Sequence, residues 1–162
     1  MSDKGHTSAQ LAAALRYHGC TTQALGSVVA ADEIPPPGYR FPIFYIVNSS
    51  VDENVRGHWI LLYISSPVSA IEYFDPLHKP PMQYSNHIDN YLKTYSAPYY
   101  ISSTYRVQPS DSYNCGLYCC YVADKRCQNM SLSSIMQTFD QNDLVYNDNM
   151  VVSYFHQHIL AF

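Results

Sequence analysis

The chain of 162 residues has the length of one domain and is long enough to bury a sizeable core. Nine basic and thirteen acidic side chains leave a formal net charge of -4, which argues against a sequence-independent electrostatic grip on nucleic acid. No apolar run approaches the ~20 residues needed to span a bilayer, and the N-terminus lacks the pattern of a secretory signal peptide. We therefore expect a single soluble, non-secreted domain over residues 1–162.

The five cysteines form an odd set, with Cys20 far from the others, and this spacing does not resemble a disulfide framework. We expect free thiols in a reducing compartment. Zinc ligation has the wrong spacing for a common motif, so no metal is predicted; the set considered was Cys115, Cys119, Cys120, His156 and His158.

The N-terminal part is expected to contain a surface helix followed by a stiff loop. Thr7 or Ser8 can cap a helix that runs to about His18, and Gly19 is placed to end it. Residues 28–40 hold two acidic residues, three consecutive prolines and a glycine, a composition that disfavours helix interiors and central strands. This segment is predicted to form the rim of a cleft.

Three strands are predicted in the middle of the chain, over residues 41–47, 58–64 and 70–75. The first two are apolar at both their odd and their even positions, which is typical of strands covered on both faces. The second and third read as an antiparallel hairpin that closes about Ser66-Pro67. In that register His58 lies directly opposite Asp75, at a separation that lets a carboxylate reach an imidazole nitrogen.

The C-terminal half alternates helices with one strand. Helical spacing predicts a helix within residues 82–95, and alternation predicts a strand over residues 99–107. Further helices are expected from Cys115, after a cap at Ser131, and from about Asn147. Together these elements predict an α+β fold.

Cys115 has the sequence environment of a nucleophile. A polar, turn-prone loop over residues 109–114 gives way to an apolar run that starts at Cys115 and reads as a buried helix. The first turn of a helix stabilises an anion through its unpaired N–H groups and its dipole, so the pKa of this thiol should lie below the ~8.5 of a free cysteine. We expect Cys119 and Cys120, one turn later, to be packing residues.

A thiolate that attacks an amide carbonyl needs a base, a group that orients the base, and donors for the oxyanion. His58 can be the base and Asp75 its orienter, while Gln108 and the backbone N–H of Cys115 can serve as the oxyanion donors. Each of these residues alone has an ordinary structural explanation. Their joint occurrence predicts one active site.

The same motifs resemble the adenovirus endopeptidase (adenain) family and, more loosely, the SUMO-deconjugating cysteine proteases and proteases of virus-like Maverick/Polinton-type elements. The resemblance covers nearly the whole chain and includes the intervals of seventeen residues from His58 to Asp75 and seven from Gln108 to Cys115. The motifs that carry it are His18-Gly19-Cys20, Leu25-Gly26, Ile46-Val47-Asn48, Gly57-His58-Trp59, Tyr73-Phe74-Asp75-Pro76 and Cys115 to Cys120. It implies an adenain-like, papain-like core in circularly permuted order, with a mixed central sheet flanked by helices.

The resemblance also implies a narrow substrate groove that admits only small residues, so that glycine lies next to the scissile bond. Trp59 would wall this groove and the 28–40 loop, with Asp32, would face it. We expect Gly57 and Asn114, which flank the His and Cys motifs, to contact substrate as well.

Two departures bear on activation, and a third concerns the triad. The adenovirus enzyme is associated with a peptide cofactor joined through a cysteine before the oxyanion Gln, and residues 97–107 contain no cysteine. It is stimulated by DNA, which suits a basic surface better than this acidic chain. The resemblance suggests Glu at the third triad position, where this chain has Asp75. We therefore expect no required cofactor, with peptide or DNA activation open.

The sequence thus predicts a viral or virus-like cysteine endopeptidase that cleaves structural precursors at Gly-Gly-type sites through a thioester. We expect this endopeptidase to be a monomer that acts on protein substrates. Its expected locations are the virion and the host nucleus or cytoplasm. Three alternatives remain: an isopeptidase for SUMO or ubiquitin conjugates, an acyltransferase that uses the same thioester, and a non-catalytic binding module.

Overall fold

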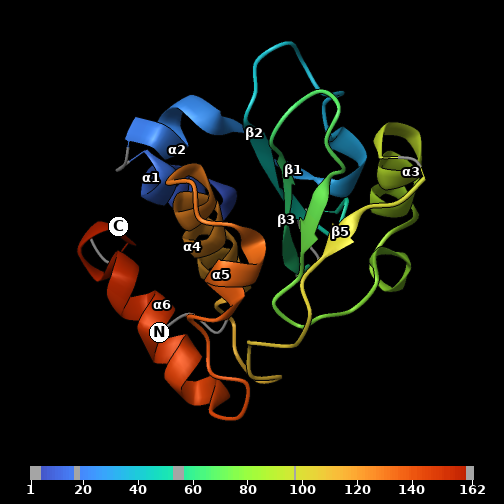
Figure 1. Cartoon of the computed structure of the whole chain (residues 1–162). Coiled ribbons are helices and arrows are strands. Elements are labelled where there is room, and N and C mark those ends of the chain that lie inside the picture. The colour runs from blue at the N-terminus through green and yellow to red at the C-terminus, as the bar shows by residue number, and fades with distance from the viewer. Residues whose placement is uncertain (1–4, 17–18, 53–56, 97, 160–162) are drawn as a thin grey trace.

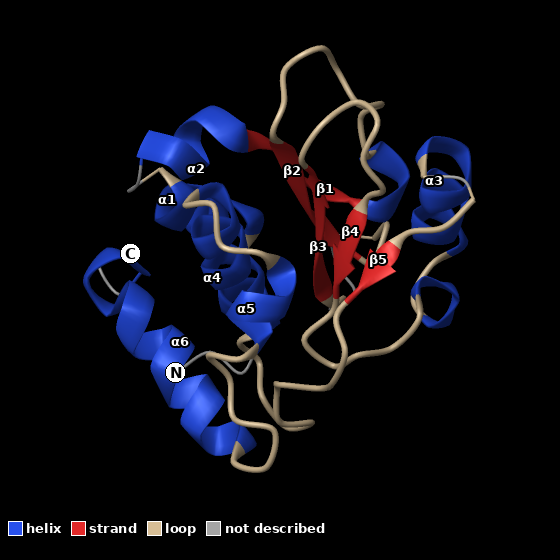
Figure 2. Cartoon of the chain, viewed as in Figure 1, coloured by secondary structure: helices blue, strands red, loops and turns tan. Residues whose placement is uncertain are grey.

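The computed structural model describes residues 5–16, 19–52, 57–96 and 98–159. For residues 157–159 it describes the backbone but not the side chains. It has the α+β architecture expected from the sequence, with a five-stranded mixed sheet between helices (Figures 1 and 2). Helices α1, α2, α4 and α5 lie on one side of the sheet and α3 on the other, while α6 packs on α1 and α4.

The strands follow one another across the sheet in sequence order. They are β1 (Leu25–Ala30), β2 (Ile43–Asn48), β3 (Trp59–Ile64), β4 (Glu72–Phe74) and β5 (Ile101–Ser102). The two outer pairs are parallel and the two inner pairs antiparallel. The α-helices are α1 (Ser8–Leu15), α2 (Gly19–Ala24), α3 (Asn86–Tyr95), α4 (Cys115–Cys127), α5 (Leu132–Met136) and α6 (Leu144–Ile159), and two 3-10 helices, η1 (Ala31–Glu33) and η2 (Pro81–Gln83), complete the set.

The central strands β2 and β3 are buried on both faces, as their composition predicts. Alternate residues of each strand point to opposite sides, so Phe44 and Leu61 join the core under α4, whereas Tyr45 and Leu62 join the core under α3. The two apolar clusters hold the sheet between its helical layers and fix which face each following residue takes.

Helix α4 is the buried centre of the larger helical layer. Its residues from 115 to 124 are all buried, and Cys119 and Cys120 are fully so, which confirms that they are packing residues. Near its C-terminus, Arg126 forms a bidentate ion pair with Glu72 of β4 at 2.8 and 2.9 Å and stacks over Tyr63. These contacts set the position of the helix against the sheet.

The N-terminal elements differ from their prediction in two places. Thr7 caps α1 through a capping box with Gln10, as expected, but α1 ends at Leu15, and Gly19 begins α2 instead of ending a helix; the predicted end at His18 lies outside the described residues. The loop predicted from residue 28 is wrong for residues 28–30, which belong to β1 and pair in parallel with β2. The partner strand supplies hydrogen bonds that no local pattern reveals.

Several other boundaries shift as well. The strand predicted over residues 99–107 is confined to β5, α3 begins at Asn86 after a cap at Ser85, and α6 begins at Leu144, before the predicted Asn147. The Ser131 cap of α5 is confirmed. None of the described helices has the length and apolarity required to cross a membrane.

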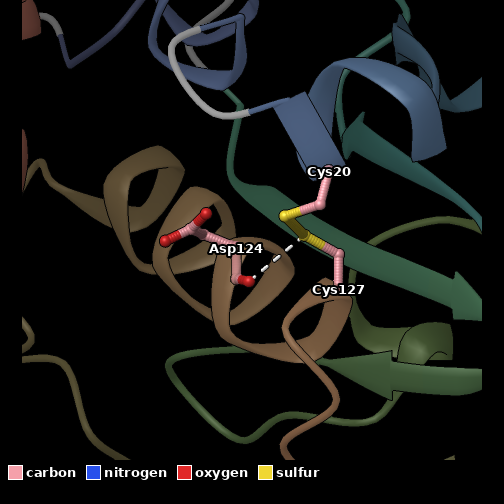
Figure 3. Close-up of side chains that lie close together, drawn as sticks. All are labelled: Cys20, Asp124 and Cys127. Atoms are coloured by element: carbon pink, nitrogen blue, oxygen red, sulfur yellow. Dashed lines mark hydrogen bonds between the residues drawn. A yellow bond between two sulfur atoms is a disulfide. The ribbon is translucent and has the colours of Figure 1, made fainter.

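The expectation of free thiols is wrong for two of the five cysteines. Cys20 of α2 and Cys127 at the end of α4 form a disulfide that links residues 107 positions apart, and Cys127 Sγ lies 3.2 Å from the Asp124 carbonyl oxygen (Figure 3). The error has a plain cause: residues distant in sequence meet where α2 packs on α4. The remaining cysteines, Cys115 among them, are free.

Candidate active site

The end of strand β2 fixes His58 at the start of β3. The backbone N–H of His58 donates to Ser49 Oγ at 2.9 Å, and its carbonyl accepts from Ser49 N at 2.8 Å. A Cβ at Gly57 would lie 1.8 Å from Asn48 Oδ1, so only glycine permits this close approach of the chain. The imidazole is therefore presented from a rigid corner of the sheet.

His58 meets Asp75, although the strand register differs from the predicted one. Leu61 pairs with Phe74, which shifts β4 by two residues from a hairpin that closes about Ser66-Pro67. Because side chains alternate with a period of two, this shift keeps His58 and Asp75 on the same face as diagonal neighbours. His58 Nε2 lies 2.6 Å from Asp75 Oδ1.

The Asp75 carboxylate is buried and fully engaged. Besides His58, it accepts hydrogen bonds from Tyr84 OH at 2.6 Å, from Lys79 N at 2.7 Å and from Leu77 N at 3.0 Å. Burial raises the pKa of the Asp75 carboxyl, but the hydrogen bonds from His58, Tyr84 and Lys79 outweigh burial and place the pKa below its usual value. Asp75 is therefore an anion at neutral pH.

The His58 imidazole lies between Tyr84 and Cys115. Its ring stacks on the Tyr84 ring with centroids 4.9 Å apart. Burial lowers the pKa of His58, but the hydrogen bonds with Asp75 and Cys115 raise it more, and the resulting pKa is about 9. His58 is accordingly protonated at neutral pH, with its Nε2 bound to the carboxylate and the other nitrogen left for the thiol.

Cys115 is the first residue of α4, as predicted, and is only 5% exposed. Its Sγ accepts a hydrogen bond from Trp59 N at 3.4 Å, so the sulfur sits against the start of β3, next to His58. The hydrogen bonds of the helix begin with Leu117 N, which donates to Asn114 O at 2.9 Å. The N–H groups of Cys115 and Gly116 precede these bonds and face the end where an anion is stabilised.

Gln108 lies at the start of the loop that leads to Cys115. Its N–H donates to Pro76 O at 3.1 Å, which ties the loop to the residue after Asp75. Its side chain is 1% exposed, with Nε2 donating to Ser112 O at 3.0 Å and Oε1 without a hydrogen-bond partner among the described residues. A carboxamide nitrogen carries two N–H groups, so one remains for an incoming oxyanion.

A groove of about 1240 Å³ opens beside Cys115, and of the predicted substrate-binding residues Trp59 and Gly57 line it. Asp32 lies exposed in η1, where its neighbour Glu33 lines the groove instead. The Asn114 side chain turns toward α6 and is not part of the lining.

Sequence reasoning missed three groups around this site. Tyr84 contacts both His58 and Asp75, but sixteen tyrosines in the chain gave no reason to single it out. The segment after Gly5 lines the groove, and His6 O accepts from Trp59 Nε1 at 3.0 Å. The third group is Asp148 of α6, which binds the loop before Cys115.

Comparison with known proteins places this geometry in a family. A model described as the Ulp1 protease family, C-terminal catalytic domain, matches residues 43–154. Among solved structures, a protease of ASFV has a TM-score of 0.53 at 12% identity and is similar over 98% of this chain and 68% of that chain. The yeast Ulp1 protease domain, solved in complex with Smt3, the yeast ortholog of SUMO, has a TM-score of 0.37 at 19% identity over 65% of this chain and 52% of that chain.

No curated protein sequence matches the chain. The family match spans more than half of the residues and includes the segments of His58, Asp75, Gln108 and Cys115. It confirms the expected relation to the SUMO-deconjugating cysteine proteases and their fold. The chain belongs to the Ulp1 protease family and is a cysteine protease.

Proposed function

We propose that the protein is an endopeptidase that matures structural precursors of a virus or virus-like element by cleaving next to small residues of the Gly-Gly type. The observation that carries this proposal is the meeting of the three groups a thiol protease needs. The His58–Asp75 contact is 2.6 Å, and the Cys115 sulfur accepts from the backbone N–H that follows His58. Cys115 is the nucleophile, His58 the acid and base, and Asp75 the group that orients the imidazole.

Acylation begins from a thiolate and an imidazolium. The Cys115 sulfur forms a bond to the scissile carbonyl carbon, and the carbonyl electrons move to its oxygen. The free N–H of Gln108 and the backbone N–H of Cys115 stabilise that oxyanion. His58 then gives its proton to the leaving amine as the C–N bond breaks, and a thioester remains.

Deacylation reverses these roles. Neutral His58 takes a proton from water, whose oxygen attacks the thioester carbonyl, and the C–S bond breaks to restore the Cys115 thiolate. Asp75 holds Nε2 throughout, so the other ring nitrogen faces the sulfur and the reacting groups. The cycle consumes one water and needs no cofactor.

The groove supports a preference for small residues near the scissile bond. The indole of Trp59 is only 8% exposed and is held by His6 O, so it forms a fixed wall beside Cys115. Gly57, on the same lining, has no room for a side chain. A glycine-rich substrate segment fits between such walls with the least steric conflict.

The test uses fluorogenic peptides with Gly-Gly at the cleavage position, with and without DNA. We expect the wild-type chain to cleave them and Cys115→Ala to be inactive. Iodoacetamide near neutral pH should label Cys115 before Cys119, because complete burial raises the pKa of the Cys119 thiol. Cleavage that persists in Cys115→Ala, or after selective labelling of Cys115, contradicts the proposed nucleophile.

A second candidate, an isopeptidase for SUMO-like or ubiquitin-like conjugates, is favoured by membership in the Ulp1 family. It uses the same residues and the same thioester, so only the substrate separates it from the first. SUMO and ubiquitin fusions should be assayed beside the Gly-Gly peptides. A kcat/KM at least ~100-fold higher for a fusion than for the free peptides would favour the isopeptidase.

A further inference from the structure

The carboxylate of Asp148, on α6, collects three hydrogen bonds from the region around Cys115. Its Oδ1 accepts from Ser112 Oγ at 2.6 Å and from Tyr118 OH at 3.0 Å. Its Oδ2 accepts from Asn114 Nδ2 at 2.8 Å. Two of these donors belong to the loop over residues 108–114, which we call the oxyanion loop, and the third belongs to α4.

Asp148 is connected to Gln108 through a single residue. Ser112 donates its hydroxyl to Asp148, while its carbonyl accepts the Gln108 Nε2–H at 3.0 Å. The hydroxyl oxygen also accepts from Asn114 N at 3.1 Å. Because Gln108 Oε1 has no partner among the described residues, the bond to Ser112 is the side-chain contact that sets the orientation of the carboxamide.

The neighbouring residue holds the other end of the loop. Asn147 is fully buried, and its Nδ2 donates to Val107 O at 2.9 Å, immediately before Gln108. Its Oδ1 accepts from Asp140 N at 2.7 Å, and its Nδ2 also donates to Asp140 O at 2.7 Å. Two adjacent residues of α6 thus hold the oxyanion loop at its start and near its end.

We propose that Asp148 is a positioning residue that orients the oxyanion loop, and that amide hydrolysis by this protein depends on it. The inference rests on the proposed roles of Gln108 and Cys115. The carboxylate holds Ser112, Asn114 and Tyr118. It acts by keeping Ser112 and Asn114, and with them the oxyanion loop, in the shape that places the Gln108 donor.

The chemistry of the three donors explains why a carboxylate is needed. An ionised carboxylate offers acceptors only, whereas an amide of the same shape offers one acceptor oxygen and one donor nitrogen. In Asp148→Asn, the amide nitrogen would face either the hydroxyls of Ser112 and Tyr118 or the amide nitrogen of Asn114, so at least one of these side chains would have to turn and accept instead of donate. The loop would relax to relieve that conflict, and a displacement of about 1 Å at a catalytic group can cost ~10²-fold in rate.

The experiment compares peptide hydrolysis with thiol alkylation in the same protein. Hydrolysis passes through an oxyanion, but displacement of iodide from iodoacetamide does not, so only the first reaction uses the oxyanion donors. In Asp148→Asn we expect kcat to fall about 10- to 100-fold with KM nearly unchanged. The alkylation rate of Cys115 should stay within about two-fold of the wild-type rate, and its pH profile should not change, because the thiol and its base are untouched.

The matched control is Asp111→Asn, the same substitution at an exposed residue of the same loop. It should retain wild-type kcat. Asp148→Glu, which keeps the charge and both acceptor oxygens, should recover part of the rate. Unchanged hydrolysis in Asp148→Asn overturns the proposal, as does an equal fall in hydrolysis and alkylation, which would mark a general loss of structure. A wild-type chain that alkylates at Cys115 but cleaves no substrate overturns the proposed function instead, and the role of Asp148 with it.

Discussion

The two halves of the candidate site are held in different ways. His58 and Asp75 lie at the ends of β3 and β4, which are hydrogen-bonded neighbours in the sheet. The Ser49 hydroxyl accepts from the backbone N–H of His58, and the backbone N–H of Lys79 donates to Asp75. The oxyanion loop contains no helix or strand and, besides the bond from Gln108 N to Pro76 O, is held by side chains of α6. Loss of one supporting contact should therefore disturb His58, which the sheet supports, less than it disturbs Gln108, whose loop is held by a few side-chain contacts.

The largest single effect outside the nucleophile is expected from Asp75→Asn, because this variant changes the group that orients the base and not a contact that supports it. The amide keeps the shape but cannot hold Nε2–H of the imidazolium as a carboxylate does, so we expect kcat to fall by about 10³–10⁴. Since Asp75 helps to raise the pKa of His58 to about 9, the alkaline limb of the pH–rate profile should move to lower pH. Measuring kcat/KM from pH 5 to 10 tests both, and a limb that does not move would contradict the assigned contact.

The same shift has a consequence for folding stability. The pKa of His58 in the folded state is above its ordinary value of 6.5, so the stabilisation that it provides is fully present below pH 6.5. It is lost as the pH rises through 9. Urea unfolding at several pH values should show this loss in the wild-type chain and a smaller one in Asp75→Asn.

Gln108→Ala should rank second and should separate the two halves. Removing one oxyanion donor costs ~10²–10³ in kcat, while the His58–Asp75 pair stays intact. The rate at which iodoacetamide labels Cys115 should therefore remain near that of the wild type. Equal losses in hydrolysis and labelling would show that Gln108 supports the thiol itself and that the two halves are not independent.

A smaller effect is expected from Tyr84→Phe. This variant keeps the ring that stacks on His58 but removes the hydroxyl that donates to Asp75, which leaves the carboxylate with its other donors. We expect kcat to fall about ten-fold or less, with Tyr99→Phe, at an exposed tyrosine, as the unaffected control. Because the Tyr84 bond helps to lower the pKa of Asp75, its loss should raise the pKa of that carboxyl.

The difference between the halves also explains what the sequence could reveal. His58, Asp75 and Cys115 can be singled out as candidates because local signals mark them: a strand start, a strand end and a loop-to-helix junction. The predicted register was wrong by two residues, yet His58 and Asp75 still meet. Successive side chains of a strand alternate between its two faces, so a shift of two residues leaves each side chain on the same face.

What could not be predicted depends on contacts between distant segments. Asp148 binds residues 30 to 36 positions earlier, through side chains whose types occur throughout the chain. Strand β1 forms because β2 lies beside it, although the prolines that follow it suggested a loop. In each case the local sequence is compatible with several structures, and packing selects one.

The disulfide between Cys20 and Cys127 provides the smallest expected effect on catalysis and the clearest separation of stability from activity. It lies at the end of α4 opposite to Cys115, away from both halves of the site. Because it closes a long loop, Cys127→Ser should lower the free energy of unfolding by about 2–4 kcal/mol, measured by urea unfolding. Rates of hydrolysis and alkylation at 25 °C should remain within about two-fold of the wild-type rates. A reducing agent should lower the stability of the wild-type chain by a similar amount and should leave the stability of the variant unchanged. If kcat fell with stability, the far end of α4 would have to influence the position of its first residue, and the two halves of the site would share a support that their separate contacts do not suggest.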